Sequence, residues 1–257
     1  MPSRLPNLVA VLFFSLVARL ASNQDLPAPQ LAVVDPAAFN RLWLAAQAAW
    51  QQGEDYQAGR MRILSEDLDS RGRVSSTTTT ELALRYVGGQ TVTEVLSSIK
   101  DGRDISAQTR IEYARQDRRS ADGGETGGAF GGGSMAAADI LPFAAQAADA
   151  LRRAAPVLRT GQLVVPYELV RPKFGAAGEL FFNPDGHPQR LVYTLKPLPP
   201  FVSRFDGDIE FQILPDGALV VSAVGFSGEG GFLLIRKYFR VRMDFSDYRR
   251  PDLPSAP

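Results

Sequence analysis

The sequence contains no cysteine, which excludes several kinds of structure at once. No disulfide can hold the fold together, no thiolate can bind a metal, and no N-terminal cysteine can carry a lipid. A chain of 257 residues must therefore gain its stability from a buried hydrophobic core, which a domain of this size can form.

Histidine is scarce, and net charge is absent. The only histidine, His187, lies in the turn sequence Pro184-Asp-Gly-His-Pro188, where a lone imidazole faces solvent and cannot form a zinc site by itself. The 28 basic and 28 acidic residues give a net charge of zero, so no overall field attracts nucleic acid or an anionic membrane. We expect no bound metal, no cofactor and no nucleic-acid partner.

Motifs for catalysis are also missing. The sequence has no G-x-S-x-G turn, no H-E-x-x-H motif, and no phosphate-loop or dinucleotide pattern in its glycine-rich stretch. A pair of strand carboxylates meeting in a cleft is the one catalytic alternative, but alternation with apolar neighbours favours the solvent face for most of them. These carboxylates are Glu81, Glu94, Glu168, Glu179 and Glu210. We predict that the protein is not an enzyme.

Only one long apolar run occurs, and it lies at the N-terminus. A short cationic start leads into Leu8 to Ala18, which is apolar and ends before Arg19. This is the pattern of a signal peptide, and the run is shorter than the roughly 20 residues of a spanning helix. We predict a signal peptide at 1–21, a tether at 22–34, and export to the periplasm or cell envelope. Secretion and anchoring by an uncleaved N-terminal segment are alternatives.

The folded body is predicted at residues 35–249, with a tail at 250–257, and it begins with a helix. Asp35 is a preferred N-cap residue, and proline at the next position suits the first helical turn. Apolar residues then recur at helical spacing until Gly53: Phe39, Leu42, Trp43, Ala46 and Trp50. We expect this face to pack against a sheet.

The first half of the body then predicts a meander of strands. Alternation and turn residues indicate strands at Met61–Leu68, Val74–Val87 and Thr91–Ile99, followed by a charged surface helix at Ser106–Arg119. Residues 120–138 are rich in glycine and poor in apolar side chains, so we predict a disordered insertion there. The alanine-rich segment Asp139–Ala155 predicts partly helical structure.

The second half is strongly β, with hairpin turns at Asn183-Pro-Asp-Gly186 and Pro215-Asp-Gly217. Apolar residues alternate with polar ones, and the last strand is unusually long, which favours a curved sheet. The polar side of the last strand carries a row of arginines: Arg236, Arg240 and Arg242. This row is either a solvated face or a docking surface for an anionic partner. The predicted fold class is mainly β (α+β): a curved antiparallel sheet or incomplete barrel with one or two helices packed against it.

This layout resembles that of the LolA-like superfamily, which comprises outer-membrane lipoprotein-sorting and related periplasmic proteins. The likeness spans residues 35–249 and is most suggestive in the last strands, from Gly230-Gly-Phe-Leu-Leu-Ile-Arg-Lys-Tyr-Phe-Arg240 to Tyr248. It implies an incomplete barrel, closed by helices, that carries acyl chains or lipids in an apolar hollow. The glycine-rich insertion departs from that pattern.

Two functional hypotheses follow, and they differ in whether the interior is hollow. In the first, an exported protein binds a lipid or acyl chain between a lid formed by Trp43 and Trp50 and an apolar wall. The wall would consist of Leu191, Tyr193, Leu195, Ile209, Phe211, Ile213, Phe239, Val241, Met243 and Phe245. In the second, a non-catalytic envelope module with a filled core binds a partner protein.

Overall fold

The computed structural model describes residues 35–87, 90–121, 140–144, 147–171, 175–198, 202–232 and 235–250. The predicted signal peptide and tether, residues 122–138 of the predicted insertion, and residues 251–257 of the tail lie outside these ranges. Within the described ranges, no helix is long and apolar enough to cross a membrane.

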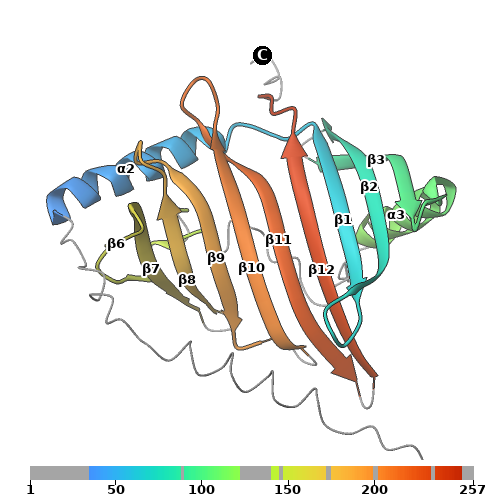
Figure 1. Ribbon diagram of the computed structural model, residues 1–257. Coiled ribbons are helices and arrows are strands. Elements are labelled where there is room, and N and C mark those ends of the chain that lie inside the picture. Colours follow the sequence, from blue (N-terminus) through green and yellow to red (C-terminus); the bar gives the residue numbers. More distant parts are fainter. Residues whose placement is uncertain are drawn as a thin grey trace, which may run out of the picture. The chain divides into compact units, whose positions relative to one another are not determined.

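The described strands form one open, curved, antiparallel sheet of 12 strands (Figure 1). Their order is β4-β3-β2-β1-β12-β11-β10-β9-β8-β7-β5, and β6 also pairs with β7. The predicted fold class is therefore confirmed. The strands are β1 (Arg60–Leu68), β2 (Val74–Val87), β3 (Gln90–Lys100), β4 (Arg103–Asp104), β5 (Leu151–Arg153), β6 (Val157–Arg159), β7 (Gln162–Val170), β8 (Gly175–Phe182), β9 (Pro188–Lys196), β10 (Val202–Ile213), β11 (Leu219–Phe232) and β12 (Ile235–Ser246).

Most neighbours in the sheet are also neighbours in the sequence, as expected for consecutive hairpins. The exceptions are the pairing of β5 with β7 and that of β1 with β12. The second of these joins the first meander to the last strand. The register of β1 and β12 runs from Arg60 opposite Ser246 to Leu68 opposite Tyr238. One continuous sheet therefore forms from the two β-rich halves of the chain.

Helix α2 (Pro36–Gly53) begins where the sequence predicts it. The Asp35 carboxylate accepts hydrogen bonds from the backbone N–H groups of Ala37 at 3.0 Å and Ala38 at 3.3 Å. Such an N-cap stabilises a helix by about 1 kcal/mol, because it satisfies donors that have no partner within the helix.

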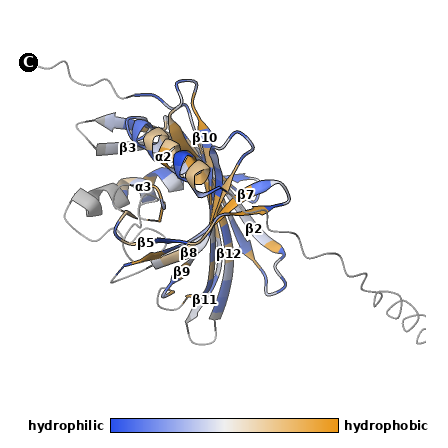
Figure 2. Cartoon of the chain, turned by 90° about the vertical axis from the view of Figure 1, so that its left-hand side faces the viewer, coloured by the Kyte–Doolittle hydropathy of each residue, from blue (hydrophilic) through white to orange (hydrophobic). Residues whose placement is uncertain are grey.

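The apolar side of α2 packs against the sheet. Figure 2 shows that the helix carries both apolar and polar residues. Phe39 and Trp43 are buried in this contact. At the end of the helix, a Cβ on Gly53 would lie 1.9 Å from the carbonyl oxygen of Leu219 in β11. Glycine is therefore required where the helix end meets the sheet.

The two sides of the sheet differ in polarity. We call the side that packs against α2 the inner face and the opposite side the outer face. In β9 and β10 the inner face carries buried apolar residues, and Leu191 lies opposite Ile209 in the register. The alternation predicted from the sequence produces this division.

On the outer face, Arg242 of β12 is held between two carboxylates. Its guanidinium makes a bidentate contact with Glu210, with both N···O distances 2.9 Å, and its Nε donates to Asp244 at 2.7 Å. Carboxylates also pair with the other two members of the predicted arginine row: Glu229 with Arg236, and Glu66 with Arg240. The row is therefore balanced by acidic neighbours.

The segment after the glycine-rich stretch is predicted to be partly helical, and residues 140–144 and 147–155 of it are described. In these residues the chain forms turns with a 3₁₀ position at Ala147, followed by the short strand β5. Ile140, Leu141, Phe143 and Ala147 are buried in the main core. This apolar run therefore packs on the inner face of the sheet.

At the other end of the sheet, helix α3 (Ser106–Ala121) confirms the predicted surface helix and packs on β3. The Ser98 N–H donates to Ser106 Oγ at 2.9 Å, and Arg110 Nε donates to the Val95 carbonyl at 3.1 Å. Strand β3 pairs with β2 on one side but has only the two-residue β4 on the other, and polar side chains of α3 thus satisfy part of its backbone.

Candidate functional site

The predicted wall residues come from β9, β10 and β12, and the fold brings eight of the ten into one core cluster. Buried members are Leu191, Tyr193, Leu195, Ile209 and Phe211, and partly buried members are Ile213, Met243 and Phe245. Val241 is buried as well, and Phe239 joins through the Phe226 ring, with centroids 6.4 Å apart. The sequence therefore identified a true inner surface.

The chain itself covers the centre of this surface. Phe143 is 1% exposed, and its ring lies 5.4 Å from that of Phe211 and 5.5 Å from that of Trp50. A predicted wall residue and a predicted lid residue thus both contact one side chain of the segment after the glycine-rich stretch. That these residues bind a ligand stays a prediction.

Sequence reasoning missed the part played by this segment. The signal was present, because Ile140-Leu-Pro-Phe143 is an apolar run directly after a glycine-rich stretch. A run of four residues has no measurable period, so the pattern does not reveal which surface it covers.

Farther along the inner face, aromatic rings form a row across β9 to β12. Tyr193 and Phe205 have centroids 6.0 Å apart, and Phe205 stacks on Phe226 at 6.0 Å. The Tyr193 ring fills the space above Gly207, where a Cβ would lie 2.3 Å from it. Burial raises the pKa of the Tyr193 hydroxyl far above its usual value, so this side chain stays neutral.

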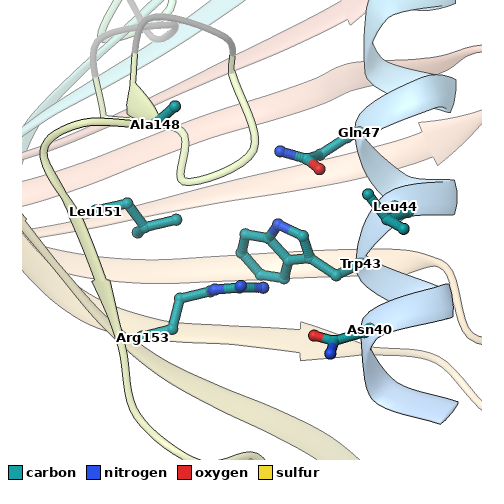
Figure 3. A pocket seen from close by; sticks show the side chains of 7 residues that line it. All are labelled: Asn40, Trp43, Leu44, Gln47, Ala148, Leu151 and Arg153. Carbon is teal, nitrogen blue, oxygen red and sulfur yellow. The ribbon is translucent and has the colours of Figure 1, made fainter. Parts of the chain in front are cut away.

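An open groove of about 410 Å³ lies between α2 and the chain from Ala148 to Arg153 (Figure 3). We call it the Trp43 groove. Its most exposed large apolar side chain is Leu44, at 64%. The other residues used below are Asn40, Trp43 and Gln47 on the helix, and Leu151 and Arg153 on β5.

Arg153 is the charged member of the Trp43 groove. Its guanidinium carbon lies 4.4 Å from the centroid of the Trp43 ring and 5.8 Å from that of Phe39. Among the described residues no carboxylate forms an ion pair with Arg153. A guanidinium that stacks on an aromatic ring keeps its N–H groups available to another acceptor.

A second pocket, of about 250 Å³, lies where α2 ends on the sheet, and its lining is mainly apolar. It includes Trp50 and Phe245, one predicted lid residue and one predicted wall residue. The Oε1 atom of Gln57, which also lines it, is buried without a hydrogen-bond partner in the described structure. The pocket therefore combines apolar walls with one unmatched acceptor.

His187 and the five strand glutamates are the candidate catalytic side chains, and all of them lie among the described residues. Within the described part of the chain, no three histidine or acidic side chains gather to hold a metal. His187 is exposed in its turn, where its backbone N–H donates to Asn183 Oδ1 at 2.9 Å. Three of the strand glutamates pair with arginines rather than with each other: Glu94 with Arg85, Glu179 with Arg159, and Glu210 with Arg242.

Comparison with known proteins leaves the family open. No family model matches the chain, and no curated protein does. Among solved structures, it is similar to a chain of the Pseudomonas aeruginosa MucA/MucB complex, with 13% identity over 84% of this chain and 100% of that chain, at a TM-score of 0.19. A crystal structure of MucB in complex with MucA(peri) gives the same identity, coverage and TM-score. At this TM-score neither match assigns a family.

Proposed function

We propose that this chain is an exported, non-catalytic protein of the cell envelope that binds a partner protein at its surface. The observation that carries the proposal is the filled inner face. Fully buried Phe143 occupies the place between Phe211 and Trp50 where the first hypothesis puts a ligand. A lipid carrier needs that space to be empty.

The size and character of the open spaces support the same proposal. Helix α2 forms one wall of the Trp43 groove and contributes the carboxamides of Asn40 and Gln47, and Arg153 contributes a guanidinium. These polar groups suit a polar ligand better than an acyl chain. Export is supported by the signal-like pattern of residues 1–21.

An apolar small molecule is the second candidate ligand. It is favoured by the pocket at the end of α2, which contains Trp50 and Phe245. Its volume of about 250 Å³ falls just below the usual range of ligand pockets, which starts at about 300 Å³. This pocket would hold part of an apolar molecule and leave the rest in solvent.

The decisive experiment titrates the purified protein with palmitate and with anilinonaphthalene sulfonate. We expect no saturable binding of either probe. Phe211→Glu should unfold the protein, because an unpaired carboxylate in a filled core destabilises it by several kcal/mol. Gln212→Glu, one residue along β10 and only partly buried, is the matched control and should stay folded.

A saturable palmitate site, with a folded Phe211→Glu variant that no longer binds it, would reverse the choice between the two hypotheses. Partner binding is tested in the native host with a photo-crosslinking side chain at Leu44, which is exposed in the Trp43 groove. The same side chain at Arg236, on the outer face, is the control. Equal adducts at both positions would argue against a specific surface.

A further inference from the structure

Among the described residues, the Trp43 groove contains a positive charge without a matching negative one. Helix α2 has no acidic residue between Pro36 and Gly53, and the only one from Ala148 to Arg153 is Asp149, which forms no ion pair with Arg153. A guanidinium beside apolar walls is complementary to an anion.

The arrangement of Arg153 favours a carboxylate. Stacking on the buried Trp43 ring holds the guanidinium plane, and a fixed guanidinium edge matches the two oxygens of a carboxylate. A phosphate group carries more charge than a single arginine balances. Figure 3 shows the Arg153 side chain extending beside the Trp43 ring, with Asn40 and Gln47 on the helix side of the groove.

Asn40 and Gln47 supply the features that a peptide backbone requires. Each carboxamide both donates and accepts hydrogen bonds, as a peptide group does. They lie seven positions apart on one side of α2, which corresponds to about 10.5 Å along a helix. An extended peptide covers that length with about three residues.

Leu44 and Leu151 provide the apolar part of the groove. Leu44 is 64% exposed, so a bound apolar side chain would remove much of its surface from water. We infer that the Trp43 groove binds an extended segment of a partner protein, with an acidic side chain on Arg153 and an apolar side chain against Leu44 and Leu151. This inference rests on the proposed function, for which it names the chemistry of the partner.

The experiment compares two fluorescein-labelled pentapeptide pools by anisotropy with the full protein. Both pools have a mixture of leucine, valine, alanine and glycine at the outer positions, and they differ in having glutamate or glutamine at the centre. We expect the glutamate pool to bind about tenfold more tightly, the effect of one charge-assisted contact.

Two variants test the groove, and one serves as the control. Arg153→Gln should abolish the preference for glutamate. Gln47→Glu should abolish it too while leaving the Arg153–Trp43 stack in place, so it decides the question if Arg153→Gln does not fold. Arg152→Gln, next to Arg153 on β5, should keep the preference. Melting temperatures establish that each variant is folded.

Equal binding of the two pools by the wild type would overturn the inference. So would a preference that survives both groove variants. Dodecanoate binding that depends on Arg153 in place of peptide binding would identify a fatty-acid site and also overturn it. The palmitate and dye titration tests the proposed function separately. If the protein binds neither probe and neither peptide pool, the filled core stands and only the inference about the groove is overturned.

Discussion

The rings of Phe143 and Phe211 meet edge to face, with centroids 5.4 Å apart, at the centre of the inner face. Phe143 comes from the segment that follows the glycine-rich stretch, and Phe211 comes from β10. Their contact places a side chain of this segment against the surface that the sequence predicts to be a ligand wall. The first prediction tests how much stability this contact provides.

Replacing Phe143 by alanine should lower the free energy of unfolding by about 3 to 5 kcal/mol, because the side chain is 1% exposed and its removal leaves a cavity. Urea unfolding followed by circular dichroism measures the loss. Ile111→Ala, at a position 55% exposed on α3, should change stability by less than about 0.5 kcal/mol. Equal stability of Phe143→Ala and the wild type would show that the segment does not belong to the core.

The contact between Gly53 and Leu219 makes a steric prediction. Gly53→Ala would place a Cβ 1.9 Å from a backbone oxygen, so the end of α2 must move away from β11. We expect a loss of about 1 to 3 kcal/mol, typical of overpacking. Gly72→Ala has open space around it but a φ of +76°, so it should show only the conformational cost of about 1 kcal/mol. Thermal unfolding of both variants separates the two effects, and a Gly53→Ala protein as stable as wild type contradicts the close approach.

The Glu210–Arg242 pair predicts a pH-dependent contribution to stability. The hydrogen bonds from Arg242 lower the pKa of Glu210 below its ordinary value. A carboxyl group with a lowered folded-state pKa stabilises the protein above its ordinary pKa, and this contribution is lost as pH falls through the folded value. Because the side chains are 41% and 38% exposed, the contribution at neutral pH should be at most about 1 kcal/mol.

Urea unfolding of Arg242→Gln at pH 7 and at about pH 3 measures the contribution of this pair to the free energy of unfolding. We expect the variant to be less stable than wild type at pH 7 and the difference to shrink in acid. Arg236→Gln, whose side chain is 74% exposed, should have a smaller effect at both values. A deficit of Arg242→Gln that is the same at both values would mean that the arginine acts through packing alone.

Tyr56 and Asp216 connect the chain after α2 to the turn between β10 and β11. The Tyr56 hydroxyl donates to the Asp216 carboxylate at 2.7 Å, and this hydrogen bond is the main cause of the lowered pKa of Asp216. Tyr56→Phe should therefore raise the pKa of Asp216, as followed by carboxyl carbon NMR. Tyr238→Phe, on β12, is the control and should leave it unchanged. If the pKa of Asp216 is unchanged in Tyr56→Phe, Arg250 and the backbone hydrogen bond cause its lowered value instead.

The sequence by itself determined the elements whose signals are local. Asp35 and its following proline determine the start of α2 because an N-cap acts within one turn, and alternation through Ile209, Phe211 and Ile213 determines the inner side of β10 because successive side chains point to opposite faces. The same local signals selected the wall and lid residues that share the core.

Only the tertiary structure decided what covers that wall and which strands join. The pairing of β1 with β12 and the packing of Phe143 on Phe211 connect residues far apart in the chain. The periodicity of a short stretch of sequence does not indicate such contacts. The same holds for Arg153, which reads in the sequence as one of many surface arginines. It becomes the charged wall of a groove only because β5 pairs with β7 beside α2 and brings its guanidinium over Trp43.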